Sequence, residues 1–124
     1  MADSDWIDIS EEYTEWLRFA NAGMLNRGNL HCFNHASEHL PTGDPVIEIG
    51  SFAGLSTNLL THYLGRHKRT NSLFTCDRWT FEGAIPGGTL GDSGIAHDQY
   101  REFVRETFIR NVRFFSHRRL PCTI

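Results

Sequence analysis

The sequence has no long apolar run, no excess of basic charge and only three cysteines. No stretch approaches the roughly 20 apolar residues of a membrane-spanning helix, and the acidic N-terminus lacks the basic-then-apolar pattern of a secretion signal. A formal net charge of −3 argues against a general nucleic-acid-binding protein. Cys32, Cys76 and Cys122 are odd in number and widely spaced, which argues against a disulfide framework. We therefore expect a cytoplasmic protein that binds neither membranes nor nucleic acid.

The composition is that of one globular domain. Hydrophobic residues make up 40% of the chain and charged residues 22%, and 124 residues suffice for one domain with a modest core. Apolar periodicity predicts helices over 10–22, 29–40, 55–64 and from residue 98 onward, and apolar runs predict strands at 46–49, 73–76 and 112–115. The helices are expected to be capped by Ser10, Asn29 and Asp98, and the third to end at Gly65.

The order of these elements predicts an α/β fold. Strands and helices alternate after two N-terminal helices, which is typical of half a doubly wound sheet with about three parallel strands. The chain is accordingly divided into a helical segment, residues 1–41, and a Rossmann-like domain, residues 42–124. Half a sheet would leave Val46–Ile49 as an apolar edge, through which the chain could associate with itself.

A glycine turn follows the first predicted strand and is the strongest signal in the chain. Gly50 allows a backbone conformation that other residues avoid, and Gly54 lets the next helix begin close to the strand and to a ligand. The first N–H groups of that helix would point, unpaired, into the turn. Asp77 directly follows the second predicted strand, near the ~20-residue spacing at which such units place a carboxylate on a ribose.

The spacing of the glycines points away from a dinucleotide site. The fingerprint G-x-G-x-x-G would require glycine where this chain has Phe52. The chain instead reads E-I-G-S-F-A-G-L-S-T from Glu48 to Thr57, and T-C-D-R-W from Thr75 to Trp79. Together these motifs resemble class I S-adenosylmethionine-dependent methyltransferases, in the subfamily with E-I-G-S-x-x-G-x-S-T on the first turn. The resemblance extends from about residue 23 to the end of the chain.

The resemblance implies a cofactor, S-adenosyl-L-methionine, and a set of residues that would bind it. Asp77 would accept hydrogen bonds from the ribose hydroxyls, and Glu48 would lie near the cationic methionine end. Trp79 would lie beside the adenine, where stacking competes with an ordinary packing role. The full set of cofactor-binding residues is Glu48, Gly50, Ser51, Phe52, Gly54, Ser56, Asp77, Arg78 and Trp79.

Catalysis is less strongly implied than cofactor binding. The family's fold has seven strands, and its fourth strand and following loop usually carry the acceptor-binding and catalytic residues, which this sequence lacks. We therefore expect the cofactor-binding half of a methyltransferase, with no assigned catalytic residue. Its partner would be a small-molecule acceptor or a complementing chain.

Other functions and sites compete with this interpretation. A degenerate domain would bind a nucleoside ligand or a partner chain without catalysis, and an NAD-dependent oxidoreductase fragment is disfavoured by the missing glycine. His31, His35 and His39 recur every four residues, but without a third ligand type they predict a solvated helix face, not a metal site. The basic cluster at 66–69 is expected to be a solvated helix end that complements the helix dipole.

Overall fold

The computed structural model describes residues 11–124, which form an α/β fold. The three strands make a parallel sheet preceded by two helices, as predicted, and the strand order is β1-β2-β3. Among residues 11–124, no helix is both long and apolar enough to cross a membrane. The elements are α2 (Glu12–Ala20), α3 (Arg27–Glu38), β1 (Val46–Ile49), α4 (Leu55–Arg66), β2 (Leu73–Cys76), α5 (His97–Phe115) and β3 (Cys122–Thr123).

The first two strands are where the sequence predicted them, but the third is not. Residues 112–115, predicted to be a strand, are the last turn of α5. Val112 continues the helical spacing of Val104 and Phe108, and all three side chains are buried on one face of α5. The third strand is Cys122–Thr123, too short to be recognised from an apolar run.

The helix boundaries differ from the predictions by a few residues. Asn26, not Asn29, is the N-cap of α3: its side chain accepts the Asn29 N–H at 3.0 Å, and Asn29 Oδ1 accepts the Asn26 N–H at 2.9 Å. Gly65 does not end α4, which continues to Arg66.

The predicted cap of the last helix is also wrong. Asp98 lies inside the first turn of α5, and Ala96 occupies the N-cap position. The predicted cap Ser10 lies outside the described residues.

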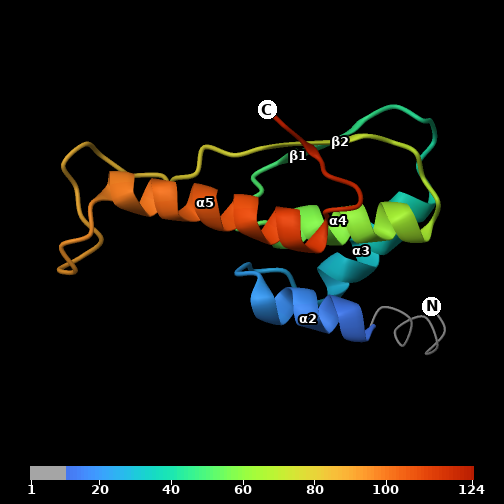
Figure 1. Ribbon diagram of the computed structural model, residues 1–124, viewed down its shortest axis with the longest axis horizontal. Helices are drawn as coiled ribbons and strands as arrows, with labels where there is room; N and C mark the ends of the chain where they lie inside the picture. Colours follow the sequence, from blue (N-terminus) through green and yellow to red (C-terminus); the bar gives the residue numbers. More distant parts are fainter. Residues whose placement is uncertain (1–10) are drawn as a thin grey trace.

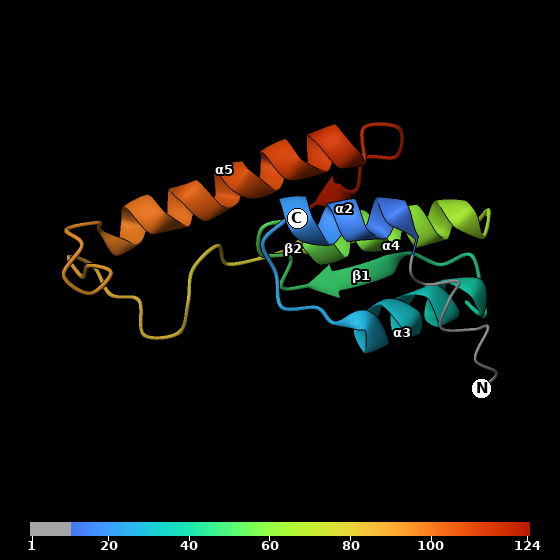
Figure 2. The same ribbon diagram turned by 90° about the horizontal axis from the view of Figure 1, so that it is seen from below.

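The four helices of residues 11–124 lie on one side of the sheet (Figure 1). Helices α4 and α5 form the two crossovers between the parallel strands, and α2 and α3 pack against α4. The first half of α5 and the long loop before it project beyond the sheet (Figure 2). The core therefore lies mainly between α2, α3 and α4, and its buried members are Leu17, Leu30, Leu55, Leu59 and Tyr63.

The outer edge and outer face of β1 are open. Ile47 is 65% exposed and Ile49 is 85% exposed, because they point away from the helices. Among the described residues, no strand pairs with the outer edge of β1. The predicted apolar edge is therefore present, and its backbone groups are available for pairing.

A buried network of amides fixes α5 against α2 and α4. The side-chain amide of Asn58 on α4 donates to Asn21 Oδ1 at 3.0 Å, and Ser116 Oγ donates to Asn58 Oδ1 at 2.7 Å. The Asn111 amide on α5 donates to the carbonyl of Ala53 at 2.8 Å. This last bond ties α5 directly to the glycine turn, so the network also positions the site described below.

The buried Tyr63 hydroxyl gives a stability prediction. Its ring is fully buried, and the hydroxyl has no hydrogen-bond partner among the described residues. Burial, assisted by the Glu11 carboxylate and opposed by Arg66, raises the pKa of Tyr63 to about 12. The folded state therefore keeps this proton after the unfolded chain loses it near pH 10, so this contribution to stability falls as the pH rises from 10 towards 12.

Tyr63→Phe should raise the free energy of unfolding by about 1 kcal/mol at pH 7, because it removes an unpaired buried hydroxyl. It should also remove the extra loss of stability above pH 10. Urea unfolding at pH 7 and between pH 9 and 11 measures both effects. Tyr100→Phe, at a half-buried ring on α5, is the control and should change neither. A destabilised Tyr63→Phe variant would mean that the hydroxyl makes a stabilising bond.

Candidate functional site

The glycine turn connects the end of β1 to the start of α4. The Gly50 N–H donates to the carbonyl of Cys76 at 2.8 Å, the last rung between β1 and β2. Gly50 has φ +90°, and Gly54, which directly precedes α4, has φ +97°. These values lie in the left-handed region, where a Cβ is strained. The turn therefore requires both glycines of the motif.

The two glycines face different surroundings. A Cβ added to Gly50 would meet no atom within 4 Å, so the backbone there is bare and faces open space. A Cβ added to Gly54 would lie 3.1 Å from Val112 Cγ2 and 3.5 Å from the Phe108 ring. Gly54 therefore allows the start of α4 to approach α5, whereas Gly50 leaves room beside the strand ends.

The carboxylate of Asp77 joins the turn after β1 to the turn after β2. Its Oδ2 accepts the Phe52 N–H at 2.7 Å, and its Oδ1 accepts the Trp79 N–H at 2.6 Å. Each carboxylate oxygen can accept two hydrogen bonds, and the residue is only half-buried. Asp77 therefore holds both turns in place and still has acceptor capacity for a ligand.

A hollow of about 500 Å³ opens at the carboxyl ends of β1 and β2. Ligands of open parallel sheets bind at this edge, and the volume is within the range of small-molecule sites. Gly50, Asp77 and Arg78 line it, as predicted members of the site. The sequence analysis missed the other lining residues, Ile49, Cys76 and Thr80, although two of them are the last residues of their strands.

Glu48 lies behind this hollow, between the sheet and α4, and does not line it. The residue is 8% exposed, and its carboxylate accepts hydrogen bonds from Ser56 Oγ, from Thr57 Oγ1 at 2.5 Å and from Thr75 Oγ1 at 2.7 Å. Three hydroxyl donors satisfy a buried carboxylate that would otherwise be costly. Glu48 and Ser56, both predicted to bind the cofactor, thus hold the first turn of α4 against β1 and β2.

Three other predicted residues surround the turn without lining the hollow. Ser51 is 2% exposed, and its hydroxyl has no partner among the described residues, so a polar atom in the turn is left for a ligand or water. The ring of Phe52 is partly exposed. The Trp79 ring packs on Phe108 of α5, with ring centroids 4.8 Å apart. Of the two roles predicted for Trp79, stacking on the adenine or ordinary packing, the structure gives the second a partner, Phe108.

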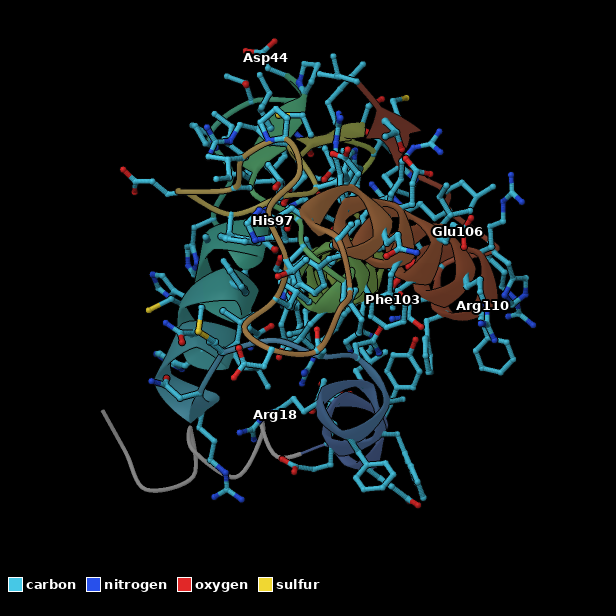
Figure 3. All side chains as sticks on the ribbon, turned by 90° about the vertical axis from the view of Figure 1, so that its left-hand side faces the viewer. Arg18, Asp44, His97, Phe103, Glu106 and Arg110 are labelled. Atoms are coloured by element: carbon cyan, nitrogen blue, oxygen red, sulfur yellow. The ribbon has the colours of Figure 1, made fainter. Side chains whose placement is uncertain are left out.

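A second hollow, of about 400 Å³, adjoins the first and shares Arg78 and Thr80 with it. His97, at the start of α5, lines it and orders the long loop: its Nδ1 accepts the Ile85 N–H at 3.0 Å, and its Nε2 donates to the Thr89 carbonyl at 3.0 Å. Figure 3 shows His97 on the loop side of α5. These bonds hold part of the long loop, from Ile85 to Thr89, against the start of α5.

The histidines of α3 form a row. The His31 and His35 ring centroids are 6.3 Å apart, and those of His35 and His39 are 4.2 Å apart. Within residues 11–124, no three His, Cys, Asp or Glu side chains are arranged to hold a metal ion.

Glu48→Ala should lower the free energy of unfolding by about 3 kcal/mol, because the buried hydroxyls of Thr57 and Thr75 and the half-buried hydroxyl of Ser56 lose their shared acceptor. Glu48→Gln, which keeps one carbonyl oxygen, should cost less. Chemical denaturation measures both, with Glu106→Ala as the control because that carboxylate is exposed on the side of α5 away from the loop (Figure 3). If Glu48→Ala were as stable as the control variant, the hydroxyl cluster would not stabilise the start of α4.

Comparison with known proteins gives no family assignment. No family model matches the chain, and no curated protein matches it. The geometry of the site and the motifs therefore carry the functional argument.

Proposed function

We propose that the chain is the cofactor-binding part of a class I S-adenosylmethionine-dependent methyltransferase, and that the hollow at the ends of β1 and β2 receives the nucleoside part of the cofactor. The observation that carries this proposal is the position of Asp77. Its carboxylate lines the hollow, is fixed by two backbone N–H groups and keeps free acceptor sites.

The residues around the hollow suit the chemical groups of the cofactor. A carboxylate at Asp77 can accept hydrogen bonds from both ribose hydroxyls. Gly50 has no side chain to block a ligand, since even a Cβ there would meet no atom within 4 Å. The unpartnered Ser51 hydroxyl lies in the same turn and can bind a polar group of the ligand or a bridging water.

Glu48 has a smaller role in this proposal than the resemblance implies. Its carboxylate is already bonded to three hydroxyls and does not line the hollow. It would therefore act on the cationic end of the cofactor only through its electric field, which a buried site screens weakly.

The adjoining hollow is our proposed position for the methyl acceptor. It shares Arg78 and Thr80 with the first hollow, so the two ligands would lie next to each other. When bound, the cofactor supplies an activated methyl group, and transfer depends mainly on alignment of the two ligands. The chain's own contribution would be to bind, orient and partly enclose them.

A binding domain without catalysis is the second candidate. The bonds from Asp77 to the Phe52 and Trp79 N–H groups favour it, because they give the carboxylate a structural role that needs no reaction. Both candidates require nucleoside binding, and only a transfer assay with a methyl acceptor separates them.

Calorimetric titration with S-adenosylmethionine, with NAD as the comparison ligand, tests the proposal. We expect saturable binding of S-adenosylmethionine alone. Asp77→Asn keeps one acceptor oxygen but loses the charge, and should weaken binding about tenfold. Asp92→Asn, in the exposed loop, should bind as the unaltered chain does. Unchanged affinity in Asp77→Asn would remove Asp77 from the site, and no binding by a folded sample would reject the proposal.

A further inference from the structure

We propose that a second site, at the amino-terminal ends of β2 and β3, binds the phosphate group of a phosphorylated small molecule between Arg69 and Arg119. A hollow of about 430 Å³ lies there, beside the start of β2 and the segment that leads into β3. Its polar lining includes Thr61, Arg69, Thr70, Ser72 and Arg119. The Asp77 hollow lies at the carboxyl ends of the strands, and this hollow lies at their amino-terminal ends. The second site is therefore separate from the proposed cofactor site.

The charge of the chain is unevenly distributed, and this region is its basic part. Residues 49–76 and 107–124 contain no Asp or Glu, but they hold seven of the 12 Lys and Arg residues. Both Arg69 and Arg119 come from these segments. These two segments therefore carry positive charge only, although Glu11 pairs with Arg66 and the backbone carbonyls of Glu38 and Asp44 contact Arg69 and Asn71.

The two arginines are held in place but are not neutralised. Arg69 donates from Nε to the Ser37 carbonyl at 3.1 Å and from Nη2 to the Glu38 carbonyl, and Arg119 Nη2 donates to the Asn71 carbonyl at 2.7 Å. Among residues 11–124, no carboxylate oxygen lies within 4.0 Å of either guanidinium. A guanidinium has five N–H donors, so most of theirs are unused.

Arg69 already has one ordinary structural role, because it donates to the carbonyls of Ser37 and Glu38 and so caps the C-terminus of α3. This capping occupies two of its five N–H donors, and Arg119, which lies beyond the end of α5 at Phe115, uses one. Both are half-buried, and burial lowers the pKa of Arg119. A bound anion would compensate for the water that these guanidinium groups have lost.

The chemistry of the hollow favours phosphate over a carboxylate. A phosphate monoester carries a charge of about −1.5 to −2 at pH 7, which matches two guanidinium groups, whereas one carboxylate leaves a positive charge. Arginine also binds phosphate oxygens with two parallel hydrogen bonds. The hydroxyls of Thr70 and Ser72 line the same hollow and can donate further bonds.

The surroundings favour a compound larger than phosphate itself. A neighbouring hollow of about 490 Å³ shares Thr61 and Arg119 and is also lined by Tyr13, Phe115 and Arg118. The rest of a phosphorylated small molecule could lie there, against the two aromatic rings. The phosphates of a nucleic-acid backbone are the other source of the same chemistry, and the test below separates them.

NMR titration of the full chain with inorganic phosphate and then pyrophosphate, at ionic strength held constant with chloride, tests this site. We expect saturable shifts of the amide signals of Asn71, Ser72 and Arg119. Arg119→Gln and Arg69→Gln keep a donor for the backbone carbonyls but lose the charge, and each should weaken binding about tenfold. Arg110→Gln is the matched control, because Arg110 is exposed on the outer side of α5 (Figure 3).

Several results would overturn the proposal. Shifts that do not saturate, or that fall outside the 69–73 and 119–122 segments, would show adventitious anion binding in the unaltered chain, whatever the variants do. Equal affinity in Arg69→Gln, Arg119→Gln and Arg110→Gln would do the same. Saturation by a single-stranded oligonucleotide but not by pyrophosphate would show that the site takes a nucleic-acid backbone, not a small molecule. None of these results depends on whether S-adenosylmethionine binds.

Discussion

The two hydrogen bonds that the Asp77 carboxylate accepts are the constraint on which the functional end of the molecule depends. The ladder between β1 and β2 ends where the Gly50 N–H meets the Cys76 carbonyl. Beyond that point both segments turn sharply, with positive φ at Phe52 and at Trp79. Asp77 accepts the N–H of each of these residues, so one side chain joins the two turns, and Asn111 of α5 also holds the first turn through the Ala53 carbonyl. The hollow at the strand ends lies beside these two turns.

The acidic residues of the two motifs differ in their surroundings: Glu48 supports the structure, whereas Asp77 lines the hollow proposed to bind a ligand. Glu48 is buried in the layer between the sheet and α4, and three hydroxyls from both sides of that layer donate to its carboxylate. Asp77 lines the hollow, and backbone N–H groups use only part of its acceptor capacity. The difference follows from the strand pleat and strand length: Glu48 points to the helix side one residue before β1 ends, whereas Asp77 follows the end of β2.

The sequence was sufficient to predict the first two strands, the turn and the parallel direction of the strands, because each depends on local patterns of apolar residues and glycines. It was not sufficient for features that depend on distant neighbours. Thr75 bonds to Glu48 because the register places these two residues side by side on adjacent strands. Val112, which lies far along the chain, leaves little room for a Cβ at position 54, so glycine is favoured there. The apolar run at 112–115 was misread because its helical period becomes clear only when Val104 and Phe108 are known to be buried with it.

Amide chemical-shift changes during a titration with S-adenosylmethionine would locate the bound cofactor on the chain. We expect saturable changes concentrated in two segments, Gly50–Gly54 and Asp77–Thr80, because these segments form and surround the hollow at the strand ends. Saturable changes confined to other parts of the chain would show that the nucleoside binds elsewhere. No changes in a folded sample would contradict the claim that this turn is a cofactor site.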